Sequence, residues 1–391
     1  MDISKFTDRK TGKLVPIKTV QGIQDHAFIP DPLPPKWTFD PALWPTLVEA
    51  KRCLGMLEGA ARILPSPELF LKPLQRQESL TSSRLEGTYA TAQEVMLFEL
   101  NPKESQKSSE QKNAWMEVGN YTKALAKGCQ DLVRLPFCVR IIKDLHKILL
   151  TGVRGARSNP GELRTYQVHL GSNRRYVPPP PQEAERCLHD LEDYCNAKNF
   201  DAFDPLVQCF LIHYQLEAIH PFADGNGRIG RVILSLMIYK LCDLHLPWLY
   251  LSPFFERYKD EYIDNLFKVS TEGDWSTWIK LCLRGVIDQA TKTVEKCRTL
   301  QELRSDMHRR THDDGRTRIH AIIESLFGSP FIRIVDIAKR HHVRYPTAKS
   351  DVAYLIGKNI LEELPDFPVK TFLSPEIFRI AYSEDNHELA A

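Results

Sequence analysis

A twelve-residue segment between two helical patterns constrains the fold and the chemistry of this chain more than any other. Residues 220–231 have the sequence HPFADGNGRIGR, which places a histidine, a carboxylate, two glycines around an asparagine, and two arginines close together. Apolar residues recur at helical spacing on both sides, over residues 204–219 and 228–244. The segment is therefore predicted to be a tight loop, in which Gly225 and Gly227 bend the chain onto the start of the second helix.

The start of that second helix has the properties of an anion-binding site. Unpaired backbone N–H groups and the positive end of the helix dipole meet there. Arg228 and Arg231, three residues apart, can each bind a pair of phosphate oxygens. Asp224 suits Mg²⁺, which prefers a carboxylate plus phosphate oxygens, and His220 is the only group in the loop that can accept a proton near neutral pH. The loop is therefore predicted to bind and transform a nucleotide phosphate.

The segment matches the signature HPFx[DE]GNGRxxR at every fixed position, so the chain resembles the Fic family of protein adenylyltransferases. An ordinary helix–helix turn with a glycine-rich cap and solvated arginines is the alternative interpretation. A GNG triplet alone would favour that turn, whereas the complete signature favours the family. The resemblance is strong over about residues 137–240 and looser over the helical N-terminal part.

The resemblance implies transfer of AMP from ATP to a serine, threonine or tyrosine hydroxyl, on a target protein and on the chain itself. His220 would remove the hydroxyl proton, and Asp224 would hold Mg²⁺ (or Mn²⁺), the only cofactor implied. Arg228 would bind the leaving pyrophosphate, and Arg231 the γ-phosphate. The other nucleotide-binding positions are Gly225, Asn226, Gly227 and Gly230; the first three would form an anion hole from backbone N–H groups and the Asn226 side chain. Positioning and charge neutralisation dominate this kind of chemistry.

A short motif further upstream, residues 82–87 (SSRLEG), matches the inhibitory motif [ST]xxxE[GN] of the same family. Gly87 is a natural residue just past a helix end, and helical spacing puts Ser82 and Glu86 on one face. By itself the pattern describes an ordinary solvated helix end. Together with an intact loop, the resemblance implies that Glu86 reaches Arg231 and occupies the place of the nucleotide's γ-phosphate.

Residues 162–181, upstream of the loop, are predicted to form a β-hairpin. Side chains alternate over Tyr166–Leu170, a Gly-Ser-Asn turn follows, and Arg174–Val177 leads into a run of prolines. A structural ribbon is the simpler interpretation. The resemblance implies a flap that binds the backbone of a target protein along about residues 166–177 by strand addition, which can hold many sequences in register.

Tyr258 and Asn265 are candidates for binding the nucleotide base. They lie seven residues apart in one predicted helical segment, so they would share a face. Members of the family carry a tyrosine and an asparagine at about this distance from the loop. An interior aromatic residue and a helix-surface amide explain the pair equally well.

Composition points to a cytoplasmic protein. The formal net charge of +2 gives no global field that would attract nucleic acid or a membrane. The first residues are polar and resemble no secretory signal, and charges interrupt the most apolar window, residues 232–255, so we expect core helices there and no membrane contact. Nine dispersed cysteines without CxxC pairs fit buried thiols in a reducing compartment.

The chain is expected to be mostly α-helical, with a Fic helical core, a β-hairpin flap and a small C-terminal winged-helix (α+β) domain. Its predicted parts are an N-terminal arm and helical region (1–115) that contains the inhibitory helix (about 76–87), a catalytic core (116–308) and a winged-helix-like domain (317–391). Within the first part, residues 1–40 are expected to be an extended arm packed on a later domain. The next region, 41–100, is expected to be helical and broken by prolines. A polar loop is predicted at 101–113, helices at 114–128 and 137–151, and a polar linker at 308–318.

The C-terminal part has three helical patterns, at 317–328, 332–343 and 347–360, followed by a candidate wing at 361–374. Six basic residues face two acidic ones between 331 and 360, an excess that suits phosphate contact: Arg333, Lys339, Arg340, Arg344, Lys349 and Lys358, with Asp336 and Asp351. DNA is therefore a candidate partner of residues 317–391, although winged helices also serve as protein-interaction or packing modules.

Two other functions remain open. The same loop could carry different phosphate chemistry, such as removal of AMP or transfer of another nucleotide or a phosphoryl group. The chain could also be a DNA-binding regulator that senses a nucleotide with a catalytically idle domain. An intact His220 argues against idleness, because simple binding needs no base. The sequence leaves open the target protein and whether the chain forms a homodimer.

Overall fold

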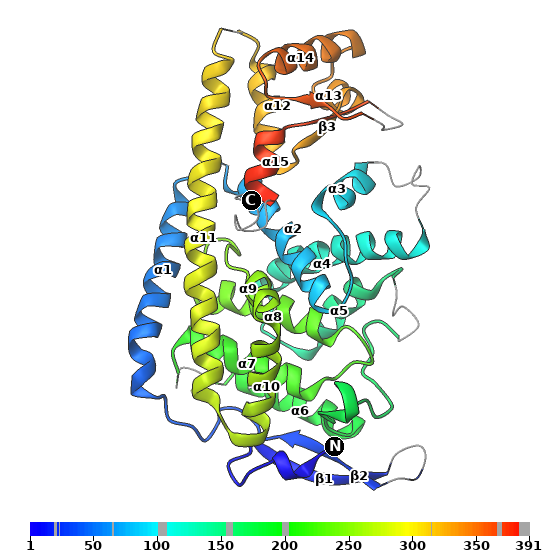
Figure 1. Cartoon of the computed structure of the whole chain (residues 1–391), viewed down its shortest axis with the longest axis vertical. Helices are drawn as coiled ribbons and strands as arrows, with labels where there is room; N and C mark the ends of the chain where they lie inside the picture. Colours follow the sequence, from blue (N-terminus) through cyan, green and yellow to red (C-terminus); the bar gives the residue numbers. More distant parts are fainter. Residues whose placement is uncertain are drawn as a thin grey trace, which may run out of the picture.

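The computed structural model describes residues 1–18, 22, 24–64, 66–100, 108–153, 159–197, 203–313, 315–365 and 370–382. These residues are mostly helical, as the sequence predicts. Two buried helices, α7 (Pro205–Ile219) and α8 (Asn226–Leu241), lie at the centre (Figure 1). Nearly every α7 side chain is buried, because α7 is apolar on all sides and so must be enclosed by other elements.

Other helices surround this pair. They are α1 (Trp44–Arg62), α2 (Pro67–Leu85), α3 (Ala92–Leu100), α4 (Ser109–Arg134), α5 (Val139–Leu150), α6 (Pro181–Cys195), α9 (Ser252–Arg257), α10 (Lys259–Glu272) and α11 (Trp275–Arg310). The longest, α11, runs along one side of the molecule with α1 packed against it (Figure 1). In the described part of the chain no helix is both long and apolar enough to cross a membrane.

Two helical predictions need correction at their ends. Pro73 lies inside α2 without ending it, because the buried contacts of this helix outweigh the loss of one backbone donor. The polar loop predicted at 101–113 is shorter, since α4 already begins at Ser109, where the Ser108 hydroxyl accepts from the amide of Gln111 at 3.3 Å. Residues 101–107 lie outside the described residues.

The N-terminal arm is a two-stranded antiparallel sheet, where the sequence predicts only extended chain. Strands β1 (Gly12–Lys18) and β2 (Gln24–Pro30) pair from Gly12 with Pro30 to Lys18 with Gln24. The arm does pack on a later part of the chain, as expected: the Thr7 amide donates to the carbonyl of Thr271 at 2.8 Å, at the end of α10. The sheet thereby covers one end of the molecule (Figure 1).

The predicted β-hairpin at 166–177 is reduced to one bridge. Leu170 and Tyr176 exchange two backbone hydrogen bonds of 2.8 and 3.1 Å around a short 3₁₀ turn, Ser172–Arg174. A side-chain hydrogen bond joins the two halves of the segment further along, because the side-chain amide of Gln167 donates to the carbonyl of Pro178 at 2.8 Å. A ladder cannot extend in this direction, because the prolines that follow have no amide to donate.

The C-terminal elements are α12 (Thr317–Gly328), β3 (Phe331–Arg333), α13 (Ile334–Arg340), α14 (Tyr345–Gly357), β4 (Glu362–Glu363), β5 (Thr371–Leu373) and α15 (Pro375–Tyr382). The three strands are antiparallel in the order β3-β5-β4. The predicted linker at 308–318 is shorter than expected, because α11 continues to Arg310 and α12 begins at Thr317. Both α12 and α15 pack against α2 and α11, so this unit is joined to the helical body.

Candidate active site

The loop between α7 and α8 has the tight geometry that its sequence predicts. His220 ends α7 in the left-handed region (φ 49°), and Gly225 precedes α8 with φ 79°. The Asn226 side chain holds the loop closed, because it accepts from the amide of Phe222 and donates to its carbonyl, both at 2.9 Å. Asn226 is buried and uses its side-chain oxygen and one amide hydrogen within the loop, so the anion-hole role of that side chain stays a prediction.

His220 lies half-buried at the end of α7 and lines a cavity. Desolvation and the positive charge of Arg164 lower its pKa to about 4, so the ring is neutral at physiological pH. Its Nδ1 has no hydrogen-bond partner among the described residues. Arg164 holds the backbone here, since its Nε donates to the carbonyl of His220 at 2.9 Å. A neutral, positioned imidazole can accept a proton.

Arg231 meets both ends of the upstream motif. Its buried guanidinium donates from Nε to the Ser82 hydroxyl at 2.8 Å and from Nη2 to the Ser82 carbonyl at 3.0 Å. Nη2 also donates to Glu86 Oε1 at 2.7 Å in an ion pair. Glu86 caps α2, and Gly87 follows with φ 81°, so the helix ends where the sequence predicts.

The Glu86 carboxylate lies directly over the start of α8. A Cβ atom at Gly227 would come within 2.2 Å of Glu86 Oε1, so only glycine leaves room for this carboxylate. Desolvation acts to raise the pKa of Glu86, but the charge and hydrogen bond of Arg231 outweigh it and keep the pKa below its usual value. An ionised carboxylate therefore lies against Gly227 and Arg231, two residues for which the family resemblance implies nucleotide binding.

Arg228 is tied to two carboxylates. Its Nη1 donates to buried Glu117 at 3.0 Å, and its Nη2 lies 3.5 Å from Asp224. Glu117 also accepts from the hydroxyl of Thr88 at 2.9 Å, just after the upstream motif. Arg228 Nε has no hydrogen-bond partner in the part of the chain that the structure describes. This nitrogen is buried, and Arg228 is not among the residues that line the neighbouring cavity.

Asp224 is the loop's candidate metal ligand. Its side chain is 44% exposed, and its Oδ1 accepts from the amide of Gly225 at 2.6 Å. Among the described residues no group of three or more histidines, cysteines and carboxylates is placed to hold a metal ion. The loop therefore fits Mg²⁺ only as one carboxylate beside phosphate oxygens and water, which is how this ion is commonly bound.

A cavity of about 360 Å³ brings some of these groups together, although neither Asp224 nor Arg228 lines it. Its lining includes Glu86, His220, Gly227 and Arg231, with four flap residues, Leu170, Gly171, Arg175 and Tyr176. Several lining residues were not predicted from the sequence: Glu217, Lys259, Tyr262, Ile263, Leu266 and Phe267. The last four recur at helical spacing on α10, and that spacing of apolar residues in the sequence could have identified them.

The structure does not bring Tyr258 or Asn265 into this cavity. Tyr258 lies at a break between α9 and α10, with φ −113° and ψ 41°, so the seven-residue spacing does not run along one helix. Its ring packs against Phe254, with centroids 4.7 Å apart. Asn265 is buried in α10, and its Nδ2 has no hydrogen-bond partner among the described residues. The predicted base-binding role therefore finds no support in this arrangement.

Gly230 is also placed away from the cavity. A Cβ atom there would lie 2.2 Å from Glu217 Oε1, and the Gly230 carbonyl lies 3.1 Å from His213 Nδ1 on α7. Its small size therefore serves the close packing of α7 against α8. Burial raises the pKa of Glu217 to about 7, because the surroundings offer it little solvation.

The fold and the loop together define a helical domain with a glycine-rich loop at the start of a buried helix. The model of the Fic/DOC family matches residues 136–238, and that of the Fic/DOC family N-terminal region matches residues 44–130. The chain therefore contains a Fic/DOC domain preceded by a Fic/DOC N-terminal region. The family resemblance inferred from the loop signature is thus confirmed.

Curated relatives are similar over part of their length. A protein adenylyltransferase fic-1 from Caenorhabditis briggsae is 36% identical over 122 residues, which are 29% of this chain and 24% of the relative. A protein adenylyltransferase Fic from Aedes aegypti is 29% identical over 154 residues, 39% of this chain and 28% of the relative. The chain therefore spans only about a quarter of the curated relatives that it matches.

Solved structures share the fold. A Fic family protein from Desulfovibrio desulfuricans superimposes with a TM-score of 0.55 at 20% identity, over 86% of this chain and 97% of the other. Fic-1 from Caenorhabditis elegans gives a TM-score of 0.51 at 20% identity, over 67% of this chain and 75% of the other.

Proposed function

We propose that the chain is a protein adenylyltransferase that uses ATP and Mg²⁺ (or Mn²⁺) and inhibits itself through Glu86. The observation that carries the proposal is one cavity shared by a neutral His220, the amide-rich start of α8, Arg231 and the flap. Relatives named protein adenylyltransferases support it. In this reaction the target hydroxyl oxygen bonds to the α-phosphorus, the bond from that phosphorus to the bridging oxygen breaks, and pyrophosphate leaves.

In this mechanism, the proton of the attacking hydroxyl passes to His220. The N–H groups at the start of α8 and the donors of Arg228 and Arg231 stabilise the phosphate oxygens, a role that depends on their fixed positions. Asp224 would hold Mg²⁺, which neutralises phosphate charge when bound.

The ion pair between Glu86 and Arg231 supports autoinhibition. The γ-phosphate carries more charge than a carboxylate and needs the same guanidinium, so the two compete for one partner. In this proposal Glu86, 2.7 Å from Arg231, keeps the triphosphate away from that guanidinium. The inhibitory segment therefore includes Ser82, Glu86 and Gly87, at the end of α2.

The direct test is to incubate the full chain with α-labelled and γ-labelled ATP in parallel. Self-labelling from the α-label alone is the expected result. Labelling from the γ-label alone would mean phosphorylation instead. An AMP-modified protein that loses its label on incubation with the chain would point to the reverse, hydrolytic reaction.

The flap provides the proposed target-binding edge. The backbone amides of Val168 and His169 have no hydrogen-bond partner among the described residues. We expect Val168→Pro or His169→Pro to reduce labelling of a target protein about tenfold or more and to change ATP affinity less, because strand addition depends on main-chain donors. The measurements are target labelling and equilibrium ATP binding; equal losses in both would make the flap merely a scaffold.

The C-terminal unit carries a second candidate function, DNA binding. Its elements follow the order helix–strand–helix–helix–strand–strand, which supports a winged-helix unit at 317–391. In this proposal the unit follows the helical region 1–115 and the catalytic core 116–308 along the chain. Two of its basic side chains form ion pairs, and four others are exposed. Arg333 pairs with Asp336 and Lys358 with Asp313, whereas Lys339, Arg340, Arg344 and Lys349 are exposed.

If this unit binds DNA, retention of the full chain on duplex DNA should fall steeply with salt, and Lys349→Glu should weaken it further. Lys268→Glu on α10, also at an exposed lysine, is the matched control and should have little effect. The full chain is required, because α12 and α15 pack against α2 and α11. Failure to bind duplex DNA at low salt would leave a protein-interaction or packing role for this unit.

We also propose that the chain is located in the cytoplasm.

A further inference from the structure

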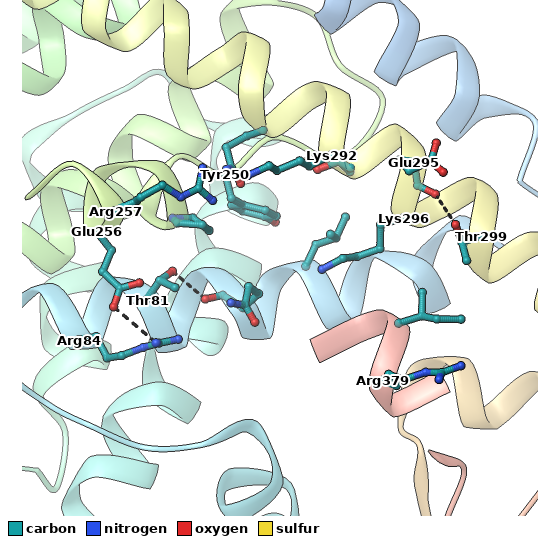
Figure 2. A pocket seen from close by; sticks show the side chains of 16 residues that line it. Thr81, Arg84, Tyr250, Glu256, Arg257, Lys292, Glu295, Lys296, Thr299 and Arg379 are labelled. Carbon is teal, nitrogen blue, oxygen red and sulfur yellow. Dashed lines mark hydrogen bonds and ion pairs between the residues drawn. The ribbon is translucent and has the colours of Figure 1, made fainter. Parts of the chain in front are cut away.

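A further cavity, of about 900 Å³, lies between α2, α9, α11 and α15 (Figure 2). Its volume is in the range of small-molecule sites. It is separate from the cavity that contains His220, and the two share no lining residue. Four elements that are far apart in the sequence thus surround a space that the proposed reaction does not use.

Helix α2 separates the two cavities. Gln77, Thr81 and Arg84 lie on the face toward the larger cavity. The opposite face carries Ser82 and Glu86, which bind Arg231. A ligand in the larger cavity therefore touches the helix that carries the inhibitory carboxylate, but from its other side.

The larger cavity has an excess of positive charge. Five basic side chains line it, on α2, α9, α11 and α15: Arg84, Arg257, Lys292, Lys296 and Arg379. Two carboxylates line it, Glu256 and Glu295. Glu295 is 61% exposed and pairs with Arg298, outside the lining, so it contributes little to balancing the cations.

Three of the cations already have acidic neighbours. Arg84 lies 3.5 Å from Glu256, and both Arg257 and Lys292 pair with Asp288, at 3.4 and 3.2 Å. These pairs hold the side chains around the cavity without exhausting their donors, because guanidinium and ammonium groups each carry several N–H bonds.

Lys296 and Arg379 differ from the other three. Neither forms an ion pair within the described ranges of the chain. The half-buried Lys296 ammonium donates to the carbonyl of Ala381 at 3.2 Å, and Figure 2 shows it directed into the cavity. Desolvation and the nearby charge of Lys292 lower the pKa of Lys296, so the surrounding groups compensate its positive charge only in part. An anion beside it would supply that compensation.

We propose that this cavity binds a small molecule with several phosphate groups. Cations on four elements around one space suit separated anionic groups on one ligand, and arginine is well matched to phosphate oxygens. Leu74, Tyr250 and Pro253 supply an apolar wall for the ligand's body. The ligand bridges α2 to α11 and α15.

Occupancy of the site stabilises α2 in the position in which Glu86 pairs with Arg231, because a ligand favours the conformation whose contacts it makes. The ligand is therefore an inhibitor of AMP transfer; this consequence rests on the proposed function, whereas the binding site does not.

The binding test uses inositol hexakisphosphate with the full chain in isothermal titration calorimetry at physiological salt. This probe carries phosphate groups around a ring and is poorly suited to the smaller, 360 Å³ cavity that Glu86 enters. We expect Lys296→Met and Arg379→Met each to weaken binding about tenfold, since each removes a charge-assisted contact. Lys280→Met is the matched control, because Lys280 is exposed on the same helix α11 and does not line the cavity. It should bind like the unmodified chain.

Equal binding by all four proteins would overturn the site, since it would mean general attraction to surface charge. No binding by the unmodified chain would overturn it as well. The regulatory step is tested separately, by self-labelling at fixed free Mg²⁺: the probe should slow the unmodified chain several-fold and leave Glu86→Gly and Arg379→Met much less affected. Equal slowing of all three would overturn the regulatory step. Absence of labelling without the probe would count against the proposed reaction and leave the calorimetric result intact.

Discussion

A chain with Glu86 replaced by glycine is expected to label itself with AMP at least tenfold faster than the unmodified chain. The Glu86 carboxylate lies 2.7 Å from Arg231 and over Gly227, so its removal leaves the guanidinium and the start of α8 open to the γ-phosphate. ATP affinity should rise together with the rate. ADP, which lacks the γ-phosphate, should gain much less, and this difference separates the proposed competition from a general opening of the cavity.

The stability of the apo protein should fall only slightly. Glu86 is 38% exposed, so solvent screens the ion pair, and its loss should cost about 1 kcal/mol. Arg231 keeps both Ser82 acceptors. Thermal unfolding with and without ATP measures the two effects.

Glu272→Gly is the matched control for this prediction. Glu272 is the last residue of α10 and precedes Gly273, which has φ 68°, so the change also removes a carboxylate directly before a positive-φ glycine at a helix end. It should leave labelling unchanged. If Glu86→Gly has the labelling rate and ATP affinity of the unmodified chain, residues 82–87 are an ordinary helix end.

The loop could be predicted from the sequence because its conformation is local. Gly225 can adopt a positive φ at no steric cost, and the apolar periods on both sides set the ends of α7 and α8. The meeting of Glu86 with Arg231, across 145 residues, could be anticipated only from the family resemblance. Nothing in the local pattern of either segment specifies that contact.

The roles of Tyr258, Asn265 and Asn226 depend on contacts that the sequence does not specify. Tyr258 lies between α9 and α10, and neither Tyr258 nor Asn265 lines the cavity. The family resemblance implies that the Asn226 side chain contributes to the anion hole. In the structure its oxygen and one amide hydrogen bond to the backbone of Phe222 inside the loop. Sequence patterns indicate residue types, but not which of several available partners a polar side chain takes.

The flap illustrates the same limit for strands. Alternation predicted a hairpin at 166–177, yet only Leu170 and Tyr176 pair. In an antiparallel ladder, the next pair to exchange hydrogen bonds would be Val168 with Pro178, and Pro178 has no amide to donate. The carbonyl of Val177, which faces away from that pair, accepts instead from the amide of Phe28, on β2, at 2.8 Å. That donor lies 149 residues upstream, and no local pattern reveals it.

Replacing His220 should reduce AMP transfer about 100- to 10,000-fold, the contribution that a general base typically makes. The neutral ring can accept the proton of the attacking hydroxyl because burial keeps its pKa at about 4, well below physiological pH. ATP affinity should change little, since the donors expected to bind the phosphates are the N–H groups at the start of α8 and two arginines. Transfer and equilibrium nucleotide binding are the two measurements.

The choice of replacement matters, because His220 lies in the left-handed region with φ 49°. Alanine is strained there, whereas asparagine adopts that conformation more readily and still cannot act as a base near neutral pH. His220→Asn should therefore bind ATP like the unmodified chain and transfer AMP as poorly as His220→Ala. His189→Ala, at an exposed histidine on α6, should leave both properties unchanged. Transfer by His220→Asn at the rate of the unmodified chain would show that the base is a different group and that the proposed mechanism is wrong.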